Sequence, residues 1–157
     1  MTAIPRSALA LAVLVPAGAM ATALIAQYGF GLSPCDMCWW QRYAHIAALV
    51  LALLAWVVRD VRAQALLFWL AVLGIVISGL IGGFHAGVEY HWWQGLTTCS
   101  TTRLGGGDAL DAIMNAPIIR CDVAAWTMFG ISMAGYNFLG SLIAAAMIAV
   151  LARRPVR

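Results

Sequence analysis

The sequence predicts an all-α integral membrane protein: a bundle of four transmembrane helices with one long loop on the outer side that carries a short helix. Of the 157 residues, 64% are hydrophobic and only 10% are charged, whereas soluble domains carry about 25% charged residues. The apolar residues gather in four runs, each long enough to cross a bilayer core of about 30 Å. Because the chain has the length of one domain, we expect residues 1–157 to form a single membrane domain.

The four spans are expected at about 8–28, 39–58, 63–84 and 127–151. The first run also has features of a signal peptide, since Arg6 precedes a short apolar core that ends near Ala19-Met20-Ala21. The apolar run continues beyond that point, so a retained helix is the preferred interpretation. Pro16 lies within this run, and the neighbouring helices of a bundle can tolerate a proline there.

Small and polar residues interrupt the last two spans. The third span contains Gly74, Ser78, Gly79, Gly82 and Gly83. The fourth span contains Ser132, Gly135, Asn137, Gly140 and Ser141. Small residues let membrane helices approach closely, and polar side chains avoid lipid by facing other helices. We therefore expect the small residues of the third span to allow close helix packing and the polar groups of the fourth span to face the bundle.

The arginines predict the orientation of the protein in the membrane. The chain has no lysine, and six of its nine arginines flank the spans on one side: Arg6, Arg59, Arg62, Arg153, Arg154 and Arg157. The positive-inside rule then places both termini in the cytoplasm. All four cysteines fall on the opposite side, where disulfides persist. The net charge of +3, without a basic cluster interleaved with aromatic residues, argues against nucleic acid as a partner.

A Cys-x-x-Cys pair stands where the second span begins. Ser33 is the expected N-cap, which places Cys35 in the first helical turn and Cys38 one turn later. A helix N-terminus stabilises thiolates. Arg42 follows Cys38 by four residues and shares its face, so it could support the thiolate, a bound anion or a polarised carbonyl. Alternatively, Arg42 is an interfacial arginine whose side chain snorkels to water.

The long outer loop is expected at about 86–125 and carries the other two cysteines, Cys99 and Cys121. A loop of this length is usually functional. Between the cysteines we expect a glycine hinge at 105–107 and a short helix at about 108–115, either on the membrane surface or packed on the bundle.

Two histidines and an acid stand near the start of this loop. His85 and Glu89 lie four residues apart and share a face if the third helix continues, and His91 follows. His85 and Glu89 are either an interfacial polar pair or a proton site beside a redox group.

The cysteines could serve redox exchange, metal binding or structural bridging. A zinc site usually needs four clustered ligands, but Cys99 and Cys121 stand 22 positions apart, although His85 and His91 could add ligands. A structural bridge between Cys35 and Cys38 would close almost no loop and would gain little stability. We therefore favour redox exchange and predict no metal site.

Three blocks of sequence resemble a known family. The segment 34–42, PCDMCWWQR, resembles the P-C-x-x-C-x-x-Q/E-R signature of the bacterial disulfide bond formation protein B (DsbB) family. The segment 85–89, HAGVE, followed by Trp93, Gly95 and Cys99, is similar to that family's second block. The third block is matched more loosely by Cys121-Asp122, Trp126, Phe129-Gly130, Ser132-Met133 and Tyr136-Asn137.

The resemblance implies a quinone-dependent thiol oxidase of the bacterial inner membrane, with its cysteines in the periplasm. Its protein substrate would be a periplasmic thioredoxin-fold, DsbA-like dithiol carrier. The carrier would attack Cys99, the released Cys121 would attack Cys35, and Cys38 would pass electrons to ubiquinone or menaquinone. Arg42 would lie beside the quinone. We include His85, Glu89 and His91 among the candidate quinone-binding residues.

Two other interpretations remain. One is a quinone reductase that resembles vitamin K epoxide reductase, although in that class the close cysteine pair follows the loop pair along the chain, and here it precedes it. The other is a protein with four spans that is not an enzyme and that binds metal or serves a structural role.

Overall fold

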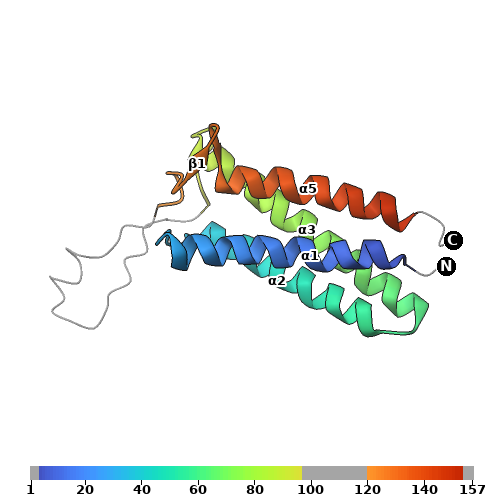
Figure 1. Ribbon diagram of the computed structural model, residues 1–157. Coiled ribbons are helices and arrows are strands. Elements are labelled where there is room, and N and C mark those ends of the chain that lie inside the picture. Colours follow the sequence, from blue (N-terminus) through green and yellow to red (C-terminus); the bar gives the residue numbers. More distant parts are fainter. Residues whose placement is uncertain (1–3, 97–119, 154–157) are drawn as a thin grey trace.

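Four long helices run side by side in the computed structural model, which describes residues 4–96 and 120–153 (Figure 1). They are α1 (Arg6–Leu24), α2 (Asp36–Val57), α3 (Val61–Glu89) and α5 (Met133–Ala152). A single π-helical turn, η1 (Ile25–Gly29), continues α1. With η1 included, all four are long and apolar enough to cross a membrane, which confirms the all-α four-helix prediction. The expected glycine hinge and short loop helix lie outside the described residues.

The helices pack through small side chains. The core consists of Ala8, Leu9, Ala12, Ala48, Ala52, Ala55, Phe68, Ala71, Val72, Ile75, Ala145 and Ile148. A Cβ atom added to Gly74 would lie 3.0 Å from the Ala48 Cβ on α2, and one added to Gly79 would lie 2.9 Å from the Ser141 Cβ on α5. These glycines therefore let α3 approach both neighbours, as expected for helices that associate in lipid.

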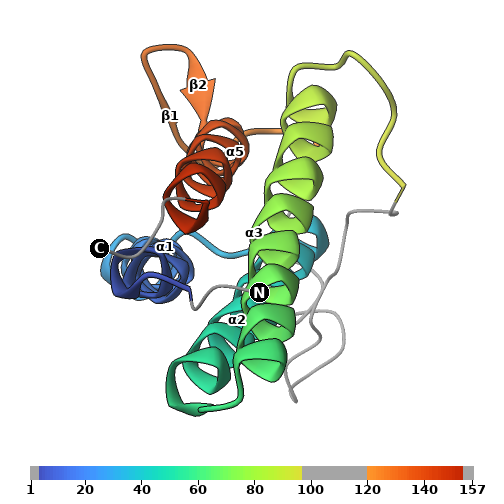
Figure 2. The same cartoon turned by 90° about the vertical axis from the view of Figure 1, so that its right-hand side faces the viewer.

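The outer surface of the bundle is apolar on every side. Large exposed side chains include Leu14 on α1, Val57 on α2, Leu66 on α3 and Ile143 on α5, each at least 60% accessible. In Figure 2, where α1 is seen nearly end-on, α3 runs along the right-hand side of the bundle, and it packs against both α2 and α5. Such a surface suits contact with lipid tails, and the protein is a multi-pass membrane protein.

The expectation that the last helix begins at about residue 127 is wrong. Residues before it form an antiparallel hairpin of β1 (Thr127–Met128) and β2 (Ile131–Ser132). Both turn residues have positive φ, 51° at Phe129 and 77° at Gly130, as the tightest hairpin turns require. Ser132 then caps α5, because its Oγ accepts a hydrogen bond from the Gly135 N–H at 3.2 Å.

The third helix also differs from the expectation, since α3 continues through Glu89 rather than ending near residue 84. The loop therefore starts later than residue 86. At the other end of α3, Asp60 is the N-cap, and its Oδ1 accepts a hydrogen bond from the Ala63 N–H at 2.8 Å. The extra turn of helix matters for function, because it carries His85 and Glu89 on one rigid element.

The start of α1 and the end of α5 lie at one end of the bundle, and the start of α2 with the cysteine pair lies at the other. In Figure 1 the first two lie together on the right, and the hairpin and the start of α2 lie on the left. The hairpin is tied to α3 through Tyr90, whose hydroxyl donates to the Gly130 carbonyl at 3.0 Å and accepts from the Ser132 N–H at 2.9 Å.

Candidate active site

The Cys-x-x-Cys pair forms the N-terminal end of α2. Cys35 itself is the N-cap, not Ser33 as predicted, and its Sγ accepts a hydrogen bond from the Cys38 N–H at 3.3 Å. Both thiols are free, and the two sulfurs lie 3.1 Å apart. The Cys35 thiol donates to the Cys38 sulfur, and this hydrogen bond together with burial raises the pKa of Cys35. A movement of about 1 Å would bring the sulfurs to the bond length of a disulfide.

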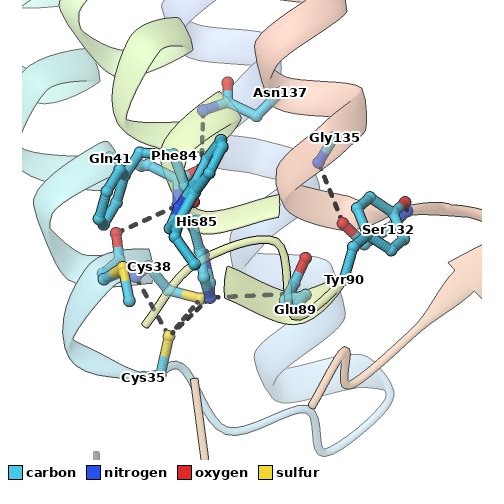
Figure 3. A network of polar contacts seen from close by, with 12 residues as sticks. Cys35, Cys38, Gln41, Phe84, His85, Glu89, Tyr90, Ser132, Gly135 and Asn137 are labelled. Carbon is cyan, nitrogen blue, oxygen red and sulfur yellow. Dashed lines mark hydrogen bonds and ion pairs between the residues drawn. The ribbon is translucent and has the colours of Figure 1, made fainter. Parts of the chain in front are cut away.

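Two further reactive groups meet Cys35 from other parts of the chain. The His85 Nε2 lies 3.5 Å from the Cys35 Sγ (Figure 3). The Cys121 Sγ, the Cys35 Sγ and a ring nitrogen of His85 all lie within 4.8 Å of one another, and all three residues are buried. Such a trio could hold a metal ion, but Cys121 is disulfide-bonded, so its sulfur is not available as a ligand. The trio instead brings a third sulfur within reach of the pair.

Arg42 lies one turn deeper than Cys38, and its side chain is held inside the bundle rather than snorkelling to water. Only 7% of the residue is accessible. The guanidinium donates to the Gln27 Oε1 at 2.5 Å and to the Ala23 carbonyl at 3.3 Å, and it lies 5.0 Å from the centre of the Trp39 ring. Gln27 stands on the π-helical turn η1, a feature that is frequent at functional sites. Within residues 4–96 and 120–153, no carboxylate lies within 4.0 Å of this charge.

A cavity of about 540 Å³ opens beside these groups, between α1, α2 and α5. Its wall is mostly apolar, and its polar lining includes Cys38, Gln41, Arg42, His45, His85 and Glu89. Two buried polar atoms of this lining, the His45 Nδ1 and the Glu89 Oε2, have no hydrogen-bond partner. Because buried polar atoms are normally satisfied, the cavity is suited to a largely apolar ligand that carries a few polar groups.

A chain of buried amides connects the site to α5. The Gln41 Nε2 lies 3.1 Å from the His85 Nδ1, and the Gln41 Oε1 accepts from the Asn137 Nδ2 at 2.8 Å (Figure 3). The Asn137 Oδ1 in turn lies 2.9 Å from the His45 Nε2. Asn137 faces the bundle interior, as predicted from its place in the fourth span, whereas the roles of His45 and Gln41 were not predicted. His45 could have been predicted to face the bundle interior, because it is a polar residue within an apolar span.

Comparison with known proteins identifies the family. The sequence profile of the family described as disulfide bond formation protein DsbB matches residues 5–151. The chain belongs to this family. It is 33% identical over 164 residues to the disulfide bond formation protein B of Acidovorax sp. (strain JS42), with 94% of this chain and 87% of that protein covered. It is 31% identical over 177 residues to the protein of the same name from Paracidovorax citrulli (strain AAC00-1), with 100% and 94% covered.

A third relative is a protein of Rickettsia prowazekii (strain Madrid E) described as uncharacterised, which is 30% identical over 126 residues, 77% of this chain and 72% of that protein. No solved structure matches the chain. Membership of the DsbB family makes the protein a membrane oxidoreductase of disulfide bond formation.

The structure gives a physical reason for the spacing of the glycine and the tryptophan in the second DsbB block. A Cβ atom added to Gly87 would lie 2.0 Å from the Trp93 ring, so only glycine leaves room for it. The Trp93 ring stacks on Phe84 with centroids 5.7 Å apart, and its Nε1 donates to the Phe84 carbonyl at 3.0 Å. This packing folds the chain back over the end of α3 directly after Glu89.

Two of the candidate residues are not brought into this site. His91 follows α3 in a backbone conformation with φ of 59°, is exposed, and does not line the cavity. Cys99 lies outside the described residues. The remaining candidates, Cys35, Cys38, Arg42, His85, Glu89 and Cys121, gather at one end of the bundle.

Proposed function

We propose that the protein is a protein-dithiol:quinone oxidoreductase that reoxidises a periplasmic, DsbA-like carrier with a thioredoxin fold. The observation that carries this proposal is the cavity, whose wall holds both the Cys38 thiol and the buried Arg42 charge. An electron acceptor that reaches a thiol from within the membrane must be apolar, and it must offer polar atoms to the guanidinium. A quinone combines both properties.

The residues of the cavity fit a quinone, either ubiquinone or menaquinone. Apolar residues of α1 and α5 suit a ring with a hydrocarbon tail, and a volume of about 540 Å³ lies within the usual range for small-molecule sites. Arg42 is a donor for a ring oxygen, and the unpartnered Glu89 Oε2 and His45 Nδ1 offer two more polar contacts. When bound, a quinone supplies an acceptor for two electrons and two protons.

The proposed electron path runs through two disulfides. A carrier thiolate attacks Cys99 of a Cys99–Cys121 disulfide, and the released Cys121 thiolate attacks Cys35 of a Cys35–Cys38 disulfide. The close approach of the Cys121 and Cys35 sulfurs supports this second exchange. The Cys38 thiolate is then free to pass its electrons toward the cavity that it lines.

The chain's own groups assist each exchange. The Cys38 N–H at the start of α2 donates to the Cys35 sulfur, as it would to a thiolate there. Arg42 is fixed by Gln27 and by the Ala23 carbonyl, so its orientation need not change when a ligand binds. The Trp93 ring stacks on Phe84 and packs against Gly87 in the last turns of α3, which carry His85 and Glu89.

The proposed location is the bacterial inner membrane, with both termini in the cytoplasm and the cysteines in the periplasm. The start of α1 and the end of α5 lie at the opposite end of the bundle from the start of α2, which carries the cysteine pair, and this arrangement is compatible with the proposed orientation (Figure 1). The arginine distribution supports the same direction.

A stopped-flow absorbance assay tests the proposal. Purified protein in detergent is mixed with a short-chain quinone and a reduced thioredoxin-fold carrier, and wild type is compared with Cys38→Ser and Cys99→Ser. Tyr43→Phe serves as a control, because Tyr43 is 59% exposed on the same turn of α2 as Arg42. Quinone reduction by the wild type and the control, but by neither cysteine variant, is expected. Equal reduction by all four proteins, or by none, would refute the proposal.

A further inference from the structure

The chain of buried amides has donors and acceptors that can be assigned one by one. It starts at His45 on α2, passes through Asn137 on α5, and returns to Gln41 on α2. It continues to His85 on α3, whose Nε2 lies 3.5 Å from the Cys35 sulfur. Three of the four helices therefore contribute to one continuous path of polar contacts that ends at the dithiol.

Two backbone carbonyls fix which way the amides face. The Gln41 Nε2 donates to the Met37 carbonyl at 3.1 Å, and the Asn137 Nδ2 donates to the Ser78 carbonyl at 3.1 Å. A carbonyl oxygen can only accept, so each amide must turn its NH₂ group toward it. Rotating either amide by half a turn would set two oxygens against each other inside a low-dielectric bundle.

The fixed amides determine where the imidazole protons lie. Because the NH₂ group of Gln41 faces the His85 Nδ1, that nitrogen must accept and carries no proton. The ring proton of a neutral His85 therefore lies on Nε2, the nitrogen that is 3.5 Å from the Cys35 sulfur. By the same reasoning the Asn137 Oδ1 requires the proton of His45 on Nε2.

We propose that Gln41 and Asn137 are positioning residues that hold His85 as a neutral Nε2–H donor to the dithiol, which leaves Glu89 as the acceptor of the thiol proton. This inference rests on the proposed function only for the fate of that proton. His85 then stabilises negative charge on sulfur without acting as a base, because Nε2 already carries a proton and protonation of Nδ1 would set it against the Gln41 NH₂ group.

Glu89 is placed to take the role that His85 cannot. Its Oε1 lies 3.7 Å from the His85 Nε2, beyond hydrogen-bond distance, and its Oε2 is buried without a partner. The residue lines the same cavity as Cys38. Oxidation of the dithiol breaks two S–H bonds, forms one S–S bond, and delivers two electrons and two protons to the quinone. Glu89 would receive a thiol proton and return it to a ring oxygen.

Nitrogen-15 NMR of histidine-labelled protein tests the positioning directly. The chain has only three histidines, and the shifts of the two ring nitrogens distinguish the tautomers. The NMR measurement needs neither quinone nor carrier, so it can fail or succeed independently of the proposed function. For the wild type in the dithiol form we expect neutral His85 with its proton on Nε2. A proton on Nδ1, or on both nitrogens at neutral pH, would overturn the inference.

Gln41→Glu is the decisive variant. A carboxylate there offers the His85 Nδ1 an acceptor in place of a donor, so the Nδ1 shift should move to the protonated position. Gln64→Glu is the matched control, because Gln64 stands in the first turn of α3, where its Nε2 donates to the Ala55 carbonyl near the end of α2. It should leave all three histidines unchanged. An unchanged His85 in Gln41→Glu would refute the role of Gln41.

The proton role of Glu89 is tested by Glu89→Gln, which keeps the shape of the side chain but cannot carry a proton. We expect quinone reduction to fall by about 100-fold or more, the usual contribution of a positioned acid or base, with the His85 tautomer unchanged. If turnover stays within threefold of wild type while the quinone is still reduced, the assignment of Glu89 is wrong and the oxidase function stands.

Discussion

Replacing Gly82 with alanine should loosen the contact between α3 and α5 at the point where the active-site amides meet. A Cβ atom there would lie 2.9 Å from the Ala134 carbonyl oxygen, 3.1 Å from the Asn137 Nδ2 and 3.2 Å from the Gln41 Oε1. The first of these atoms belongs to the backbone of α5 and cannot move alone. The two helices must therefore separate, or the amide contact must lengthen.

The magnitude follows from three opposing contributions. Overpacking costs about 1–3 kcal/mol, and a weakened interhelical hydrogen bond costs about 0.6 kcal/mol. Alanine recovers about 1 kcal/mol of helix propensity. The net loss of about 0.6–2.6 kcal/mol should lower the midpoint of thermal unfolding by about 1–10 °C in a chain of this size.

The assay is thermal unfolding in detergent, followed by circular dichroism, with quinone reduction measured on the same sample. Gly140→Ala is the matched control, because a Cβ atom at that position of α5 would meet nothing within 4 Å. Its midpoint should stay level or rise slightly. If Gly82→Ala unfolds at or above the midpoint of Gly140→Ala, the close approach of α3 and α5 is not as the structure places it.

Three further outcomes are expected. Arg42→Met should raise the KM for quinone by about tenfold or more with little change in stability. Arg42→Lys should recover only part of the affinity, because lysine lacks the planar guanidinium fork. Equal KM values for wild type and both variants would show that Arg42 does not contact the quinone. Because the pKa of Cys35 is raised, its thiol should react with iodoacetamide more slowly than a free thiol at pH 8, as peptide mass spectrometry of pulse-labelled protein would show. The hydrogen bond from Arg120 lowers the pKa of Asp122 to about 2. Any stabilisation by this exposed pair should therefore be present above about pH 4 and be lost as the pH falls through about 2. A difference in unfolding midpoint between wild type and Asp122→Asn that persists below pH 2 would contradict this.

The local sequence pattern was sufficient to predict the four-helix architecture and the part of the site that lies on α2. Four apolar runs predict four helices because lipid leaves the backbone no alternative that satisfies its hydrogen bonds. The positions of Cys35, Cys38 and Arg42 relative to one another also follow from helical spacing, which places them on one face of α2. Helix ends were less predictable, because Cys35 takes the capping role expected of Ser33, and Ser132 caps α5 where an interior residue was expected.

The sequence by itself determined the membrane class and the close cysteine pair, since each depends on neighbours within a few residues. Only the tertiary structure decided that His45, Gln41 and Asn137 form one hydrogen-bonded path to His85. Contacts between residues as far apart as Gln41 and Asn137 depend on how the helices rotate about their axes and how closely they pack. That rotation is set jointly by the glycines of α3 and the small residues facing them, which no single segment reveals.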